Sequence, residues 1–371
     1  MNTLKAIAND WVPSLSVYEP GRPIEEVARE LGFSDQDEIF KLASNENAIG
    51  PSPKAVQAMR QAAKNMHLYP DGGAFYLRRA LAAKLNVPMD QLLIGHGSNE
   101  LIELLGHAFL HKGTNIVMAD RAFIVYKLVA SSFLADTIMV PMKDLTHDLD
   151  AMLAAITPQT RIVFIANPNN PTGTMVDGAA LDRFMARVPE HVAVVMDEAY
   201  IELLPPEKQP DTIQYVRQDR NVFVLRTFSK TYGLAGLRVG YAAAPKDGID
   251  LLHRVRQPFN VNAMALAAAQ AALADEEHVA KTRTLVADGL EYLCRSFEKL
   301  GLSYVPSVTN FILVKVGKGR DIFTALQRKR VIVRPMDPSG LPEYVRVTVG
   351  TKKQNAHFIR ALKEALKEIR G

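Results

Sequence analysis

The sequence predicts an α/β fold, in which a large domain with a mostly parallel central sheet covered by helices is followed by a smaller α+β domain. Short β-branched runs bounded by turn residues, of which 161–166 and 192–196 are the clearest, are typical of strands. Helical stretches separate these runs, and both faces of each run are apolar, as in parallel strands buried between two helix layers. After Pro258 the chain changes to an Ala-rich helix and a long charged helix, which indicates a second domain.

The elements of the two domains are expected in the following order. Apolar periodicity predicts helices at 24–31, 74–85, 99–109 and 123–133, and apolar runs predict strands at 92–94, 115–119, 138–140, 161–166, 192–196, 221–226 and 239–243. The second domain should hold helices at 263–274, 276–300 and 320–328, strands at 310–316, 331–333 and 345–349, and a terminal helix. We therefore divide the chain into an N-terminal arm with the start of the small domain (1–40), a large domain (41–260) and a small C-terminal domain (261–371).

The composition excludes several classes of protein. Of 371 residues 48% are hydrophobic and 23% charged, which argues against extensive disorder. A formal charge of +4 is too small to predict nucleic-acid or membrane binding, and no uncharged apolar run reaches the ~18 residues of a membrane span. The single Cys294 excludes an internal disulfide and fits a reducing compartment. We expect a cytoplasmic protein without a metal site.

A glycine-containing turn joins the strand at 92–94 to the next helix. In Ile94-Gly-His-Gly-Ser-Asn-Glu100, free backbone N–H groups and the helix dipole favour an anion such as phosphate, to which Ser98 and Asn99 can add polar groups. Glu100 stands where a dinucleotide fingerprint needs glycine, so that interpretation fails. Taken alone, an ordinary turn with Ser98 as N-cap is the better interpretation.

Polar residues also follow two later strands. In Asn-Pro-Asn-Asn-Pro-Thr-Gly (167–173), two prolines and a glycine would hold Asn170 rigidly. In Met-Asp-Glu-Ala-Tyr (196–200), an apolar strand delivers Asp197 and Glu198, and buried acids are costly unless paired. The alternatives are an N-capping acid or a carboxylate that meets a cationic ring nitrogen.

A lysine completes the set. Lys230 lies among small and apolar residues, where desolvation would lower its pKa, although a single lysine is usually a solvated surface residue. A phosphate site, an Asn, an Asp and a buried Lys are together the parts that hold pyridoxal 5′-phosphate (PLP). Lys230 would form the Schiff base and Asp197 would keep the pyridinium protonated. Asn170 and Tyr200 would bind the phenolic oxygen, and Ser229 and Arg238 the phosphate.

Six segments resemble the fold-type-I aminotransferases, and most closely the histidinol-phosphate aminotransferases. The resemblance extends over nearly the whole chain from Tyr18. The segments are Ser-Asn-Glu-Asn-Ala-Ile-Gly-Pro-Ser-Pro (44–53), Tyr-Pro-Asp-Gly (69–72), 167–173, 197–200, Phe-Ser-Lys-Thr-Tyr-Gly-Leu-Ala-Gly-Leu-Arg-Val-Gly-Tyr (228–241) and Val-Arg-Val-Thr-Val-Gly-Thr (345–351). The segments at 167–173 and 228–241 are highly specific for the superfamily.

The resemblance implies a role for each matching position. Lys230 would be the catalytic residue, and the cofactor-binding set would be Gly97, Ser98, Asn99, Phe123, Asn170, Asp197, Tyr200, Ser229, Lys230, Arg238 and Tyr69, with Phe123 stacked on the ring. Tyr69 would reach the phosphate of the other subunit, so the resemblance implies a homodimer with shared active sites. Substrate would be bound by Arg346, by Arg334 near a distal phosphate, and by Tyr18 from the arm.

Some positions depart from the family pattern or have other interpretations. Ala48 stands where the family usually has a proline. The loop 336–340, between Arg334 and Arg346, also differs from the family pattern and could change the position of Arg334. Alternation could place Arg346 on a solvated face, and Tyr18 and Tyr69 could simply anchor loops.

The leading functional hypothesis is transamination between histidinol phosphate and a 2-oxo acid such as 2-oxoglutarate, in histidine biosynthesis. The main rival is an aromatic amino-acid aminotransferase acting on phenylalanine or tyrosine. A PLP-dependent decarboxylase or C–S lyase, or a PLP-sensing protein without turnover, are further classes. The absence of an appended helix-turn-helix segment counts against a regulator.

Overall fold

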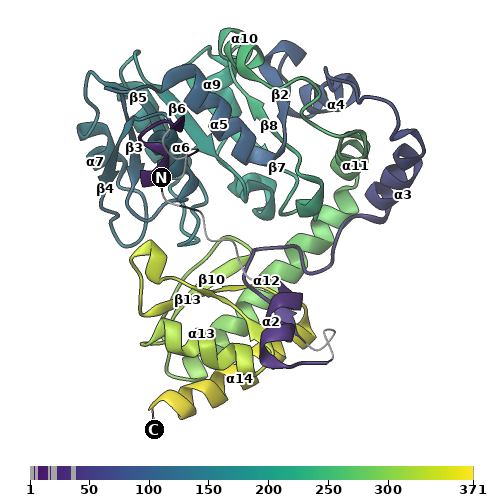
Figure 1. The fold of residues 1–371 in the computed structure, drawn as a ribbon, viewed down its shortest axis with the longest axis vertical. Helices are drawn as coiled ribbons and strands as arrows, with labels where there is room; N and C mark the ends of the chain where they lie inside the picture. Colours follow the sequence, from purple (N-terminus) through teal and green to yellow (C-terminus); the bar gives the residue numbers. More distant parts are fainter. Residues whose placement is uncertain (1–3, 5–6, 16, 18–22, 35–38, 371) are drawn as a thin grey trace.

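The computed structural model describes residues 4, 7–15, 17, 23–34 and 39–370, so Tyr18 lies outside the described residues. A seven-stranded sheet occupies the larger part of the molecule, with strand order β2-β8-β7-β6-β5-β3-β4 (Figure 1). Its strands are β2 (Leu92–Gly95), β3 (Asn115–Ala119), β4 (Asp136–Val140), β5 (Thr160–Ala166), β6 (Ala193–Asp197), β7 (Val222–Thr227) and β8 (Gly240–Ala243).

This sheet is mostly parallel, as predicted. Only β8 runs antiparallel to its two neighbours, β2 and β7. Residues 228–239 between β7 and β8 form no α-helix that could cross over the sheet, so the chain returns beside β7 in the opposite direction. That return places the Lys230 segment at the end of β7.

Helices cover both faces of the sheet because neighbouring strand residues point to opposite sides. Val163 and Ile165 belong to a core cluster with α3, α4, α8 and α11, whereas Ile162 and Phe164 belong to a cluster with α5, α6 and α10. The bounds are α3 (Pro53–Ala62), α4 (Phe75–Leu85), α5 (Gly97–Phe109), α6 (Val125–Ser132), α7 (Leu149–Ala154), α8 (Gly178–Arg187), α9 (Ile213–Arg217), α10 (Lys246–Val255) and α11 (Ala263–Leu273). The predicted two-sided burial is therefore confirmed for the central strands, whereas the edge strand β4 is partly exposed, with Met139 48% exposed.

Several of these helices begin at a side-chain cap. Ser52 caps α3 by accepting hydrogen bonds from the backbone N–H groups of Lys54 and Ala55, and Pro53 occupies the first turn. Asp177 caps α8 and Asn262 caps α11 in the same way.

A second, antiparallel sheet lies in the C-terminal part of the chain, with strand order β12-β13-β10-β9. Its strands are β9 (Tyr304–Val305), β10 (Phe311–Lys315), β12 (Arg334–Pro335) and β13 (Tyr344–Thr348), and helices α13 (Gly319–Arg328) and α14 (Lys352–Arg370) pack beside it. The long helix α12 (Glu276–Lys299) runs between the two sheets, and α2 (Ile24–Leu31) lies with the C-terminal part (Figure 1). β1 (Phe40–Lys41) pairs in parallel with β11 (Val331–Ile332). The segment that precedes the large sheet is therefore bound to the C-terminal part of the chain. In the described part of the chain, no helix is both long and apolar enough to cross a membrane.

Candidate active site

A cavity opens where the carboxyl ends of the central strands face the smaller sheet. Parallel strands gather ligand groups at this edge. Most of the residues predicted from the sequence line the cavity, which brings together segments that are far apart in the chain: Ser98, Asn99, Phe123, Asn170, Asp197, Tyr200, Ser229, Lys230, Arg238, Arg334 and Arg346.

The start of α5 is built to receive an anion. His96 is the N-cap and its side chain makes no capping hydrogen bond, so the interpretation of Ser98 as N-cap is wrong. Glu100 Oε2 accepts a hydrogen bond from the backbone N–H of His96. Gly97 has φ +74°, and a Cβ there would lie 2.6 Å from Nη2 of Arg238. Arg238 Nη1 donates to Ser229 Oγ at 3.4 Å and to the Ala235 carbonyl at 2.9 Å. A guanidinium, a hydroxyl and the free amides of a helix N-terminus therefore converge on one point.

Asp197 ends β6 with one carboxylate oxygen engaged and one open. Oδ2 accepts a hydrogen bond of 2.6 Å from the Tyr126 hydroxyl. Oδ1 is buried and accepts no hydrogen bond from any residue that the structure describes. Burial raises the pKa of Asp197 to about 6, and the Tyr126 hydrogen bond opposes that rise. A cationic partner at Oδ1 would stabilise the charged carboxylate.

The neighbouring acid has a different task. Glu198 Oε2 accepts a hydrogen bond of 2.8 Å from Arg226 Nε, and Oε1 accepts one from Thr212. Arg226 and Glu198 are both buried, so this ion pair belongs to the core. Neither Asp197 nor Glu198 caps a helix, and the N-cap interpretation of these acids is wrong.

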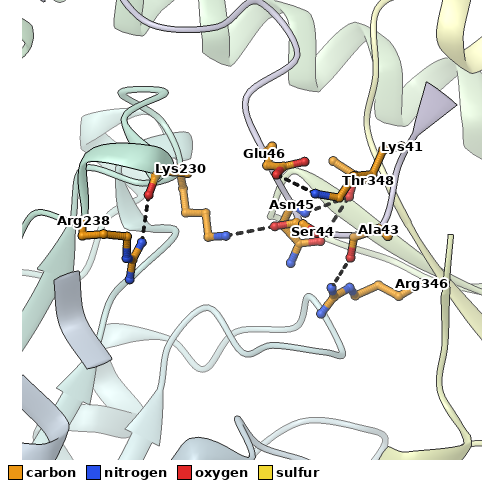
Figure 2. Close-up of polar contacts among 10 residues, drawn as sticks. Lys41, Ala43, Ser44, Asn45, Glu46, Lys230, Arg238, Arg346 and Thr348 are labelled. Carbon is orange, nitrogen blue, oxygen red and sulfur yellow. Dashed lines mark hydrogen bonds and ion pairs between the residues drawn. The ribbon is translucent and has the colours of Figure 1, made fainter. Parts of the chain in front are cut away.

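Arg346 points into the cavity from β13. Its Nη1 donates to Asn170 Oδ1 at 2.5 Å. Its Nη2 donates to the Ala43 carbonyl at 2.8 Å (Figure 2). Arg346 is only 9% exposed, which excludes the solvated face that alternation allowed. The guanidinium also lies over the Phe311 ring at 5.1 Å. Arg346 is thus a fixed, planar cation, suited to a carboxylate or phosphate.

Lys230 is partly buried in the cavity, so it is not the solvated lysine of the alternative interpretation. Its Nζ donates to the Ser44 carbonyl at 3.1 Å (Figure 2). The same atom lies 5.8 Å from the centre of the Tyr200 ring. Burial, followed by the charge of Arg346, lowers the pKa of Lys230 to about 8. A larger fraction of neutral, nucleophilic amine is therefore available near neutral pH.

The segment 43–46 contributes to the site in a way that the sequence did not reveal. Asn45 Nδ2 donates to the Tyr200 hydroxyl at 2.9 Å, and Ser44 and Ala43 supply the carbonyls that hold Lys230 and Arg346. Asn45 has φ +55°, a conformation that Asn tolerates better than most residues. The resemblance of 44–53 to the family was the signal in the sequence, and it assigned no role to Asn45.

Arg334 lines the cavity beside Met336 and Ser339, so the atypical loop leaves it facing the site. Tyr69 does not line this cavity; it is 83% exposed and stacks on Phe259 at 4.7 Å. The role predicted for Tyr18 falls outside the described residues.

The histidines form no comparable site. His107 and His111 stand four residues apart near the end of α5. However, His107 lies against Glu103 and the Phe133 ring, and His111 Nδ1 contacts the Lys112 carbonyl. Among the described residues, no three potential metal ligands lie together.

Comparison with known proteins identifies the family. The model of the family described as aminotransferase class I and II matches residues 37–362. The chain belongs to this family. It is 51% identical to the histidinol-phosphate aminotransferase of Akkermansia muciniphila over 365 residues, covering 98% of this chain and 100% of that protein. It is 52% identical to the corresponding enzyme of Moorella thermoacetica, covering 95% and 91%.

Solved structures agree with the assignment. The histidinol-phosphate aminotransferase from Sinorhizobium meliloti, solved in complex with pyridoxal-5′-phosphate, superposes with a TM-score of 0.90 at 27% identity, covering 98% of each chain. The aspartate aminotransferase from Thermus thermophilus with maleate superposes at 0.81 and 20% identity, covering 98% and 99%, which shows the shared fold. The predicted fold class, the aminotransferase activity and the PLP cofactor are confirmed.

The residues of this aminotransferase fit PLP. The buried Asp197 Oδ1 lacks a partner among the described residues and is suited to a protonated ring nitrogen. The cradle of Gly97 and Arg238, which a Cβ would fill, is suited to the phosphate, and the amine of Lys230 lies in the same cavity.

Proposed function

We propose that this aminotransferase moves the amino group of histidinol phosphate to a 2-oxo acid such as 2-oxoglutarate, in histidine biosynthesis. The observation that carries the proposal is the presence of two arginines, Arg346 and Arg334, in the cavity of Lys230, in addition to Arg238. The cofactor phosphate needs only the Arg238 end. The other two guanidiniums can then bind anionic groups of the substrates.

The residues have distinct tasks in this proposal. When bound, PLP supplies an electron-accepting ring that stabilises negative charge at the substrate Cα. Asp197 holds the ring nitrogen in its charged form, and Asn170 and Tyr200 bind the phenolic oxygen. Phe123, which lines the cavity, covers the ring face, and Lys230 carries the proton to and from the substrate Cα.

Arg346 and Arg334 orient both substrates in turn. Arg346 already points two N–H groups at oxygen acceptors, so it can present the same fork to a substrate carboxylate or phosphate. Arg334 adds a second cation on the side of Met336 and Ser339. A phosphate-bearing donor would use both charges, and a 2-oxo diacid would replace it in the second half of the reaction.

The second candidate is an aromatic amino-acid aminotransferase. Phe123, Ile124 and Met336 give the cavity an apolar wall, which phenylalanine or tyrosine could contact. Steady-state kcat/KM for histidinol phosphate and for phenylalanine, each with 2-oxoglutarate, separates the two candidates. The proposal expects histidinol phosphate to be preferred, and a preference for phenylalanine would overturn it.

Arg334→Gln provides a second discriminating comparison. If Arg334 binds a substrate phosphate, the variant should lose roughly 10-fold or more in kcat/KM for histidinol phosphate, and much less for phenylalanine. Arg187→Lys, which alters an exposed pair with Asp150, is a control for changes in a surface cation. An equal loss for both donors would remove Arg334 from phosphate binding.

We also propose that the active unit is a homodimer. Large apolar side chains are exposed in the segments near Tyr69, and an excess of exposed apolar surface is typical of an interface. These side chains are Met66, Leu68, Tyr69, Phe75, Tyr76 and Phe259. Mixing inactive Lys230→Ala and weakened Tyr69→Ala chains tests this: a shared site should restore activity in mixed dimers, whereas unshared sites would restore none. The domain boundaries 41–260 and 261–371 and the cytoplasmic location stay predictions.

A further inference from the structure

Tyr126 makes a short contact to the acid of the site. It lies in the first turn of α6 and donates its hydroxyl to Asp197 Oδ2 at 2.6 Å, although 71 residues separate the two. The Tyr126 ring is fully buried and stacks on Phe164, with ring centres 4.3 Å apart and an angle of 5° between the planes. The stacked ring fixes the direction from which the hydroxyl meets the carboxylate.

This contact gives the two carboxylate oxygens of Asp197 different surroundings. With Oδ2 held by Tyr126, Oδ1, which has no partner among the described residues, is the atom left for the ring nitrogen of the cofactor. Burial and the nearby carboxylate raise the pKa of Tyr126 well above its ordinary value, so this hydroxyl keeps its proton and always acts as donor. A hydrogen bond donated to a carboxylate favours its charged form.

We propose that Tyr126 is a positioning residue that keeps Asp197 ionised and aims its Oδ1 at the ring nitrogen. The inference rests on the role proposed above for Asp197. A carboxylate and a pyridine nitrogen share one proton, and the more basic of the two holds it. Without the Tyr126 hydroxyl, Asp197 becomes more basic, the proton moves from nitrogen to oxygen, and the ring loses its positive charge.

The direct test is Tyr126→Phe, which removes one oxygen and keeps the stack on Phe164. Two measurements report on it without turnover: the dissociation constant for PLP and the ¹⁵N NMR shift of PLP labelled at the ring nitrogen. We expect affinity to fall roughly 10-fold or more, the range of a hydrogen bond to a charged group, and the ¹⁵N signal to move toward neutral pyridine. Tyr215→Phe is the matched control, because Tyr215 also donates to an aspartate, Asp182, at 2.6 Å but outside the cavity.

A double-mutant cycle with Asp197→Asn shows whether Tyr126 acts through Asp197. When Asp197→Asn is already present, adding Tyr126→Phe should change neither measurement further. The inference would be overturned if Tyr126→Phe had the PLP dissociation constant and ¹⁵N shift of the wild type. It would also be overturned if Tyr126→Phe weakened PLP binding equally with and without Asp197→Asn. Wild-type values in Asp197→Asn itself would instead overturn the role of Asp197, so the two failures are distinguishable. Because the double variant has no buried charge at this position, it also provides a folded reference if Tyr126→Phe is unstable.

Discussion

Asn45 donates its side-chain amide to the hydroxyl of Tyr200 at 2.9 Å across a separation of 155 residues. The same residue is held by the smaller sheet, because its backbone N–H donates to Thr348 Oγ1 at 2.9 Å (Figure 2). Its carbonyl also accepts from Asn310 Nδ2 at 3.0 Å. Asn45 thus connects β13, which carries Arg346, to the tyrosine proposed to bind the cofactor. An anion bound at Arg346 would therefore be connected to Tyr200 through β13 and Asn45.

Asn45→Asp should weaken this link while keeping the shape of the side chain. The carboxylate would accept a hydrogen bond from Tyr200 instead of donating one, so the hydroxyl would turn away from the cavity. We expect kcat to fall roughly 10-fold, with a higher pKa of the absorption band of bound PLP. Asn115→Asp, which changes an amide that donates to Thr157 Oγ1 at 3.0 Å outside the cavity, should leave both unchanged. Unaltered kcat and absorption in Asn45→Asp would contradict the link.

Gly97→Ala should damage the phosphate cradle. The new Cβ would lie 2.6 Å from Arg238 Nη2, and φ +74° is strained for alanine. Because Arg238 must shift away, we expect PLP affinity to fall about 10-fold or more in equilibrium titrations. Gly113→Ala is the control, with φ +90° but no atom within 4 Å of its Cβ. Equal effects of the two variants would mean that backbone strain, and not the cradle, is responsible.

Arg346→Lys should impair substrate binding more than cofactor binding. A lysine cannot offer two parallel N–H groups to an anion and would also leave Asn170 Oδ1 without its donor. We expect KM for 2-oxoglutarate to rise roughly 10- to 100-fold, with the PLP dissociation constant within about 3-fold of wild type. A variant with normal KM but weak PLP binding would place Arg346 at the cofactor and not at the substrate.

Glu202 predicts a pH dependence of stability. Its side chain is buried, its carboxylate oxygens have no hydrogen-bond partner among the described residues, and burial raises its pKa to about 7. Between its ordinary pKa of 4.5 and about 7, Glu202 binds more protons in the folded state than in the unfolded state. The free energy of unfolding of the wild type should therefore fall as pH rises through that window.

Glu202→Gln cannot titrate and should escape this loss. Its free energy of unfolding relative to wild type should increase between about pH 5 and 7 by up to about 1.4 kcal/mol per pH unit and then level off. Urea unfolding at several pH values measures the difference, with Glu207→Gln on an exposed turn as control. A constant difference across the window would show that Glu202 is charged throughout.

Local sequence signals predicted the strands of the large sheet well, and strand ends predicted where the site residues gather. The strand Asn115–Ala119 and the helix Ile24–Leu31 have the predicted bounds. The helices α3, α7, α8, α9 and α10 were not predicted. For α8, the capping residue Asp177 was a local signal. Residues such as Lys230 and Asp197 were found because polar groups after apolar strands are unusual.

The contacts that tune those residues could not be predicted. Nothing in the predicted helix at 123–133 distinguished Tyr126, and its hydroxyl meets Asp197 only because α6 packs on the sheet. Asn45 meets Tyr200 only because the chain crosses between the two sheets. Both are long-range consequences of packing, for which a single sequence contains no local pattern.

The most direct measurement mixes the PLP-loaded protein with histidinol phosphate alone, without any oxo acid, and follows the absorption of the bound cofactor. The account predicts rapid conversion to the amino form of the cofactor, at a rate that exceeds the rate with phenylalanine, and full recovery of the original spectrum when 2-oxoglutarate is added. An unchanged spectrum with histidinol phosphate, while phenylalanine converts the cofactor, would contradict it.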